Sequence, residues 1–272
     1  MSKVWFVTGA SRGLGRSFVE AALAQGDRVA ATARDLASVQ DLADDHGDAV
    51  LPVRLDVTDK AQVAPAVQQA VERFGRLDVV VNNAGFGVLG AVEELSEKQA
   101  REQLETNYFG ALWVIQAVLP QLRKQGSGHI VQVSSTFGVA AFPLFGGHHA
   151  AKWALEGMSE SLAQEVAALG IKVTIAEPQA YSTEWAGSSL AVAETNPAYD
   201  QVREDYMAWV KDNIELGEPA AAARGLVEVV NSGNPPLRVF LGTAGHQWLP
   251  AIYADRLQTW ADWADLSHRA LR

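Results

Sequence analysis

A glycine-rich stretch near the start of the chain has the composition and position of a phosphate-binding turn. It runs from Thr8 to Gly15, after an apolar run that ends at Val7 and before an amphipathic stretch. Glycines permit the positive φ angles of a tight turn and let the backbone come close to a diphosphate. The N–H groups at the start of the following helix attract its negative charge. The turn therefore predicts a dinucleotide site whose contacts come from Gly9, Ser11, Arg12, Gly13, Leu14 and Gly15.

Two arginines bear on which dinucleotide is bound. An acidic residue at the end of the second strand would hydrogen-bond an unphosphorylated ribose, but here the run that ends at Ala33 is followed by Arg34. With Arg12 in the turn itself, two guanidinium groups can meet a 2′-phosphate. Asp35 follows directly, and an acidic residue near this position is also compatible with NAD(H). We therefore expect NADP(H), with NAD(H) as the less favoured alternative.

The overall composition excludes several other classes of protein. The 272 residues carry a formal net charge of -10, and a binder of the nucleic-acid backbone needs a basic stripe, so no nucleic-acid partner is expected. No cysteine is present and the six histidines lack the spacing of metal ligands, so no metal site is expected. No leader-like start and no run of transmembrane length occurs, which favours a cytoplasmic protein without a membrane partner.

Short apolar runs alternate with amphipathic stretches along the chain. Such runs are typical of parallel strands buried on both faces. The alternation predicts an α/β fold: a Rossmann-type, doubly wound sheet of seven parallel strands with helices on both faces, in a single domain over residues 1–272. The predicted strands are Lys3–Thr8, Arg28–Ala33, Val50–Leu55, Leu77–Asn82, Gly128–Ser134, Ile171–Glu177 and Leu237–Leu241. The predicted helices include Gly15–Gln25, Lys60–Phe74, Gln99–Gln125 and His148–Leu169.

Two segments depart from this alternation. An aromatic-rich insertion at about 182–216 follows the sixth strand, on the side where α/β proteins bind ligands. A helical tail at about 245–272 carries a stripe on one helix face that we interpret as packing or as a subunit contact. The stripe consists of Arg256, Trp260 and Trp263.

The glycine spacing TGxxxGxG resembles that of the short-chain dehydrogenase/reductase family, and further motifs extend the resemblance over nearly the whole chain. The segment from Asn82 to Gly85 resembles the family's NNAG motif after the fourth strand. The residues after Leu55 resemble the pair of positions that meets the adenine ring. Residues 178–183 resemble the PGxxxT segment along the nicotinamide, with Gln179 in place of the glycine. The resemblance adds to the cofactor-binding set Asp56, Val57, Asn83, Ala84, Gly85, Pro178 and Thr183.

The resemblance also implies a catalytic set. Asn107 matches the helix asparagine of the family's proton relay, and Ser135 matches the serine that orients the substrate oxygen. Lys152 matches the lysine of the YxxxK motif, which holds the nicotinamide ribose and lowers the pKa of the tyrosine. That tyrosine is absent, because His148 stands four residues before Lys152 and thirteen after Ser135. The implied catalytic residues are Asn107, Ser135, His148 and Lys152, and Lys152 also binds the cofactor.

A histidine in the tyrosine position changes the expected chemistry. Imidazole can act as a general acid or base, with a reference pKa of about 6.5. The cation of Lys152 should disfavour imidazolium. A neutral ring is a better base than proton donor, which favours alcohol oxidation or enolisation over carbonyl reduction. The ring is also shorter than a phenol by roughly 1.5 Å or more, and misplacement on that scale can cost about a hundredfold in rate.

Three interpretations of His148 stay open. It is an acid/base adapted to a different substrate geometry, or it marks loss of carbonyl chemistry with the cofactor kept for alkene reduction, isomerisation or cyclisation, or it inactivates the enzyme. The neighbouring His149 is expected to turn away along the helix as a surface or core residue. A non-catalytic nucleotide sensor is disfavoured because the rest of the relay is in place. The function predicted first is an NADP(H)-dependent oxidoreductase.

The character of the substrate pocket follows from aromatic residues on the segments that should border it. They favour a small hydrophobic alcohol, ketone or enone as the substrate. The family's usual assembly suggests a homodimer or homotetramer through the helices Gln99–Gln125 and His148–Leu169. The predicted substrate-binding residues are Phe137, Phe145, Tyr181 and Trp185.

Overall fold

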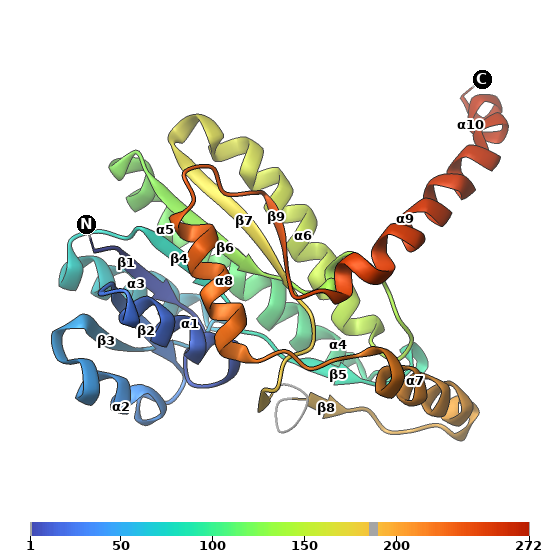
Figure 1. The fold of residues 1–272 in the computed structure, drawn as a ribbon, viewed down its shortest axis with the longest axis horizontal. Coiled ribbons are helices and arrows are strands. Elements are labelled where there is room, and N and C mark those ends of the chain that lie inside the picture. Colours follow the sequence, from blue (N-terminus) through green and yellow to red (C-terminus); the bar gives the residue numbers. More distant parts are fainter. Residues whose placement is uncertain (1, 185–189, 272) are drawn as a thin grey trace.

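A seven-stranded parallel sheet forms the centre of the computed structural model, which describes residues 2–184 and 190–271. The strand order is β3-β2-β1-β4-β6-β7-β9, and the arrows of Figure 1 show the sheet between its helices. This confirms the predicted Rossmann-type sheet, and each predicted strand is present to within two residues at either end. The strands are β1 (Val4–Val7), β2 (Arg28–Ala33), β3 (Val50–Arg54), β4 (Val79–Asn82), β6 (Gly128–Val133), β7 (Ile171–Pro178) and β9 (Arg238–Leu241).

Each strand contributes side chains to two buried layers, because successive side chains of a strand point to opposite faces of the sheet. In β1, Val4 and Phe6 join one hydrophobic cluster while Trp5 and Val7 join the other, and all four are at most 1% exposed. The layer around Trp5 is closed by α1 (Gly13–Ala24), α2 (Ala37–His46) and α8 (Pro219–Asn231). The layer around Phe6 is closed by α3 (Lys60–Phe74), α5 (Gly110–Gln125) and α6 (Gly146–Val166). With both faces covered, polar chemistry is left to the two ends of the strands.

The predicted helix Gln99–Gln125 is not continuous. It consists of α4 (Glu97–Leu104), a π-helical segment Glu105–Phe109 and α5. The π-helical segment contains Asn107, and π turns within helices often occur at functional sites. The residue composition does not distinguish the two helix types, so the sequence did not reveal this break.

Three further elements have sequence patterns too weak to predict. Helix α2 buries only Val39 and Leu42, which gives little periodic signal. The short strands β5 (Gly87–Leu89) and β8 (Leu190–Val192) pair in parallel as a separate two-stranded sheet. The predicted insertion at 182–216 contains β8 and also helix α7 (Asp200–Asn213).

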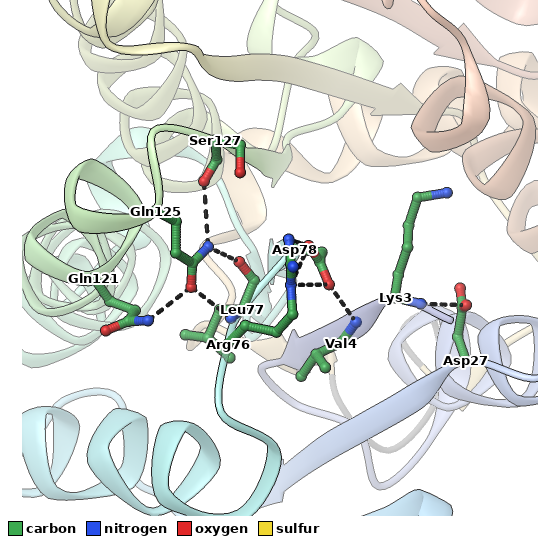
Figure 2. A network of polar contacts seen from close by, with 9 residues as sticks. All are labelled: Lys3, Val4, Asp27, Arg76, Leu77, Asp78, Gln121, Gln125 and Ser127. Carbon is green, nitrogen blue, oxygen red and sulfur yellow. Dashed lines mark hydrogen bonds and ion pairs between the residues drawn. The ribbon is translucent and has the colours of Figure 1, made fainter. Parts of the chain in front are cut away.

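A polar network ties together the amino ends of the central strands (Figure 2). The carboxylate of Asp78 accepts a hydrogen bond from the backbone N–H of Val4 at 2.9 Å and pairs with Arg76 at 2.6 Å. The Gln125 side chain accepts from the N–H of Leu77 at 3.0 Å and donates to its carbonyl at 2.6 Å. At this end of the sheet, side chains therefore complete the hydrogen bonds of backbone N–H and carbonyl groups, as the burial of those groups requires.

The C-terminal helices α9 (Ala244–Asp262) and α10 (Ala264–Ala270) extend away from the sheet, in red in Figure 1. Trp260 is 64% exposed and Trp263 is 63% exposed. Arg256 lies over the ring of Trp153 at 5.2 Å. The two tryptophans of the predicted stripe are thus not packed within the chain, and their role as a subunit contact stays a prediction. Among the residues described, no helix is both long enough and apolar enough to cross a bilayer.

Candidate active site

The turn after β1 has the close backbone packing that its glycines predict. Gly9 and Gly13 have φ angles of +67° and +56°, which favour glycine. A Cβ on Gly15 would lie 2.1 Å from the carbonyl oxygen of Gly9. The side chain of Arg12, at the N-cap position of α1, makes no capping hydrogen bond. The start of α1 is therefore a backbone cradle of the kind that receives a diphosphate.

Thr8 joins this turn to the one after β4. Its hydroxyl oxygen accepts hydrogen bonds from the N–H groups of Asn83 at 2.9 Å and Ala84 at 3.1 Å. The Asn83 amide donates in return to the carbonyls of Thr8 at 2.9 Å and Gly9 at 3.1 Å. A Cβ on Gly85 would lie 2.8 Å from Oδ1 of Asn107. The predicted NNAG residues thus contact both the phosphate turn and Asn107, and Thr8, which our predicted set omitted, is part of the same hydrogen-bonded group.

A cleft of about 460 Å³ opens beside the phosphate turn. A Cβ on Gly13 would lie 3.5 Å from the Cβ of Thr183, so the two predicted cofactor residues face each other. Arg16 is engaged in ion pairs with Glu20 at 2.7 Å and Asp41 at 2.6 Å. The cleft is lined by Gly13, Arg16, Ser17, Ser182, Thr183, Glu184 and Pro219. The cleft lies at the start of α1, next to the backbone cradle of the phosphate turn, which makes it a fitting place for a dinucleotide.

The ends of β2 and β3 place the residues that bear on cofactor choice. Arg34 and Asp35 are both exposed. The Asp35 carboxylate accepts a hydrogen bond at 3.1 Å from the N–H of Ala37, at the start of α2. Asp56 accepts from the hydroxyl of Thr58 at 2.7 Å. The acidic group beside Arg34 is therefore engaged with its own chain.

His148 and Lys152, which begin and end the HxxxK segment, are buried on one face of α6. His148 is 2% exposed and Lys152 is 7% exposed. Burial lowers the pKa of His148 to about 3, helped by the charges of Lys152 and His149 and opposed by a hydrogen bond with the Phe86 backbone. Near pH 7 the His148 ring is therefore neutral, as the sequence led us to expect.

Lys152 is held by the end of β6. Its Nζ donates to the carbonyl of Val133 at 2.7 Å. Burial lowers the pKa of Lys152 to about 8, while the charge of Glu156 raises it. Ser135 lies on the turn that follows β6, where its Oγ accepts from the N–H of Phe137 at 3.1 Å. The serine and the lysine are thus both positioned by the same strand end.

Asn107 and His148 meet at the backbone of Phe86, a residue outside the predicted set. Oδ1 of Asn107 accepts from the Phe86 N–H at 3.0 Å, and its Nδ2 donates to the Phe86 carbonyl at 2.9 Å. The same backbone adjoins the His148 ring, where it opposes the fall in the pKa of His148. The π-helical turn at Asn107 and the loop after β4 therefore position the histidine, a link that no spacing in the sequence reveals.

An aromatic cluster covers His148. The rings of Phe137 and Phe145 contact it edge-on, with centroids at 6.2 and 6.4 Å. Further rings come from α7 and α9, including the stacked pair Phe142–Trp209 at 5.3 Å. The cluster comprises Phe137, Phe142, Phe145, Tyr206, Trp209 and Trp248. Two of the predicted substrate residues, Phe137 and Phe145, are thus brought to the histidine.

Tyr181, a third predicted substrate residue, is not brought there. It packs into the hydrophobic cluster beneath α8, with its ring against Gly217. Trp185 lies outside the described residues.

His149 is a buried hydrogen-bonding residue rather than a surface one. It is 6% exposed. Its Nδ1 is 2.8 Å from the carbonyl of Phe137, and its Nε2 accepts from the N–H of Phe142 at 2.9 Å. The ring therefore fastens the loop after Ser135 to α6. No cluster of three metal-ligating side chains occurs among the residues that the structure describes.

Comparisons with known proteins agree with this geometry. The family profile described as short chain dehydrogenase matches residues 3–192. Oxidoreductase BOA17 of Botryotinia fuckeliana is 44% identical over 245 residues, which is 89% of each chain.

Solved structures give the same result. A short-chain dehydrogenase from Streptomyces avermitilis is 38% identical with a TM-score of 0.93, over 99% of this chain and 98% of that chain. A short chain dehydrogenase from Burkholderia cenocepacia in complex with NADP is 27% identical with a TM-score of 0.76, over 96% and 97% of the two chains. The chain belongs to the short-chain dehydrogenase family of oxidoreductases.

Proposed function

We propose that the protein is an NADP(H)-dependent oxidoreductase that interconverts a hydrophobic alcohol and its ketone, with His148 as the group that exchanges the proton. The observation that carries the proposal is the buried face of α6, where His148 and Lys152 lie beneath an aromatic cluster and adjoin the turn of Ser135. A catalytic relay buried next to a dinucleotide cradle is the arrangement that hydride transfer needs, because water is excluded.

Charge near the adenosine end supports NADP(H) over NAD(H). Arg12 and Arg34 are exposed at the phosphate turn and at the end of β2. Two guanidinium groups suit a 2′-phosphate. Asp35, which would favour the unphosphorylated ribose, accepts a hydrogen bond from the N–H of Ala37 at the start of α2. The similar Burkholderia cenocepacia protein was solved with NADP.

The proposed mechanism assigns one role to each buried group. When bound, the nicotinamide accepts or supplies the hydride. The Ser135 hydroxyl hydrogen-bonds the substrate oxygen, and the Lys152 ammonium holds the nicotinamide ribose. The neutral His148 ring donates one N–H to the Phe86 carbonyl and takes the alcohol proton on its other nitrogen. Asn107 fixes that carbonyl through two hydrogen bonds.

This assignment favours alcohol oxidation. A ring whose pKa is lowered to about 3 is neutral near pH 7 and has no spare proton for a carbonyl oxygen. Once protonated, the ring would form a second cation beside Lys152, which lowers the stability of the imidazolium. The imidazolium must therefore release its proton quickly. We expect alcohol oxidation to be slower than in an enzyme that has tyrosine at this position.

The aromatic cluster supports an apolar substrate. Phe137 and Phe145 present ring surface toward His148, and the ring of Tyr206 packs edge-on against Phe145. A small secondary alcohol with an alkyl or aryl group suits such a lining. We also retain as proposals the single domain over residues 1–272, a cytoplasmic location, and a homodimer or homotetramer through α5 and α6.

A second candidate is proton transfer without hydride transfer, as in an isomerase. The same observation favours it, since a neutral buried imidazole is a base that needs no redox partner. The two candidates differ in whether the oxidation state of the cofactor changes.

The test is nicotinamide absorbance with NADP⁺ and a panel of hydrophobic secondary alcohols, and with NADPH and the matching ketones and enones. We expect NADP⁺ reduction with at least one alcohol, and loss of that activity in Ser135→Ala and Lys152→Ala. Product formation at constant absorbance would support the isomerase candidate. Failure of the protein to bind either dinucleotide would overturn the proposal.

A further inference from the structure

Three titratable residues form a row along the buried face of α6. His148, Lys152 and Glu156 are spaced by four residues and are 2%, 7% and 4% exposed. Residues four apart in a helix are neighbours on one face. Lys152 therefore lies between the proposed acid/base and a buried carboxyl group to which the mechanism above gives no role.

Glu156 belongs to a cluster with more negative than positive groups. Nη1 of Arg238 pairs with Oε2 of Glu156 and, at 2.8 Å, with Glu177. Nη2 of the same arginine pairs with Glu160 at 2.8 Å. The Glu156 and Glu177 side chains are only 6% and 2% exposed. If all three carboxyl groups were ionised, one guanidinium would leave two negative charges uncompensated, and burying such charge is costly.

The cluster also contacts the turn that carries the catalytic serine. A Cβ on Gly138 would lie 2.4 Å from Oγ of Ser134 and 2.7 Å from Oε1 of Glu156. Ser134 precedes Ser135, and Lys152 donates to the carbonyl of Val133 just before it. The end of β6 is therefore shared by the serine, the lysine and the buried glutamate.

The protonation of Glu156 changes near neutral pH. Burial raises the pKa of Glu156 to about 7, and the charge of Glu177 adds to this, while Ser134 and Arg238 oppose it. The Glu156 carboxylate in turn raises the pKa of Lys152, which burial brings down to about 8. Two interacting groups with midpoints this close titrate as a coupled pair.

We propose that Glu156 is a positioning residue that sets the charge of Lys152, so that its ionised carboxylate keeps the lysine an ammonium group able to hold the nicotinamide ribose. The ribose contact rests on the proposed function. The other charged or titratable groups that face the pair are His148 and Glu160 of α6, Glu177 of β7 and Arg238 of β9.

The first test uses the free protein. The Lys152 side chain is titrated by ¹⁵N NMR with labelled lysine, and its signal is assigned by its loss in Lys152→Arg. In Glu156→Gln, which keeps the shape of the side chain, we expect the Lys152 midpoint to fall by about one pH unit. The matched control Glu160→Gln removes a half-exposed carboxylate of the same arginine and should move the midpoint by less than about 0.3 units. An unchanged midpoint in Glu156→Gln would overturn the inference.

The second test measures NADP⁺ affinity by calorimetry from pH 6 to 8.5. At pH 8 we expect Glu156→Gln to bind about threefold to tenfold more weakly than the unmodified protein. At pH 6 the two should be equal, because Glu156 of the unmodified protein is then mostly protonated and, like the glutamine, carries no charge. Equal affinity at pH 8 would overturn the inference. Absence of NADP⁺ binding in the unmodified protein would overturn the proposed function, while the NMR result would still decide whether Glu156 sets the lysine charge.

A second variant guards against misfolding of the first. Glu177→Gln removes the carboxylate that competes with Glu156 for Arg238, so Glu156 should ionise at lower pH. The Lys152 midpoint should then stay where it is or rise, and a fall would contradict the inference.

Discussion

The two ends of the central strands use polar residues in opposite ways. At the amino ends, Asp78 and Gln125 make hydrogen bonds that satisfy the backbone of neighbouring strands (Figure 2). At the carboxyl ends, backbone turns approach one another closely and a row of titratable groups is buried on α6. The first end is a closed network that stabilises the sheet, and the second keeps groups whose protonation can change.

The direction of the strands explains this difference. In a parallel α/β sheet the carboxyl ends of the strands meet the starts of the following helices, which provide N–H groups and a positive dipole end. Helices α1 and α6 begin there, and they carry the phosphate turn and His148. The amino ends have no such groups, so side chains such as Gln125 complete their hydrogen bonds.

The largest effect is expected for Gly15→Ala at the carboxyl end. Its Cβ would lie 2.1 Å from the carbonyl of Gly9, so the cradle must open. We expect NADP⁺ affinity to fall by at least about a hundredfold, as for other misplacements on the ångström scale. Gly157→Ala is the control, because no atom lies within 4 Å of its Cβ. Calorimetric affinity within threefold of the unmodified value in Gly15→Ala would show that the turn is not the phosphate site.

The next effect concerns the missing tyrosine. His148→Tyr should raise ketone reduction about tenfold to a hundredfold, because the phenol restores both reach and a proton donor. Initial rates of NADPH oxidation measure it, and His148→Phe, which adds the ring without the hydroxyl, should give no rise. Unchanged or lower turnover in His148→Tyr would indicate that the histidine is adapted to a different reaction.

A third prediction compares one histidine from each end. Burial lowers the pKa of His129 at the amino end to about 4 and that of His148 to about 3. In the unfolded chain the pKa of a histidine is about 6.5. Below that pH the unfolded chain binds protons that the folded protein does not, so the free energy of unfolding falls as the pH drops through 6.5. Between pH 6.5 and 5 we expect a loss of about 1.5 kcal/mol for each histidine.

Urea unfolding at several pH values tests this. His129→Gln and His148→Gln should each remove one histidine's share of the acid-induced loss, whatever they do to the stability at pH 7. A curve that stays as steep in His148→Gln would mean that the site accommodates imidazolium, which would favour carbonyl reduction.

The smallest effect is expected at the closed network. Gln125→Ala leaves the N–H and carbonyl of Leu77 without their side-chain partner. We expect the free energy of unfolding to fall by about 1–2 kcal/mol and NADP⁺ affinity to change by less than about twofold, since the two ends are far apart. Exposed Gln40 on α2 is the control, and Gln40→Ala should be close to neutral. A large loss of affinity in Gln125→Ala would show that the two ends of the sheet are coupled.

Much of the fold could be predicted because the relevant signals are local. The apolar runs mark the seven strands, and glycines mark the turn where a Cβ would collide at Gly15. Helix α2 and the β5–β8 pair were missed because they bury too few side chains to leave a pattern. The π-helical segment at Asn107 was missed because its composition is that of an ordinary helix.

The amino-acid sequence by itself determined the sheet, the phosphate turn and the presence of His148 four residues before Lys152. Only the tertiary structure decided how these groups are surrounded. It brought the Phe86 backbone to both Asn107 and His148, placed Glu156 against Arg238 and Glu177, and turned Gln179 toward the start of α9, where it accepts from the N–H of Thr243 at 2.8 Å. These contacts join residues from different strands and helices. The degree of burial and the neighbouring charges, which set the pKa of a group, depend on the packed chain and not on sequence spacing.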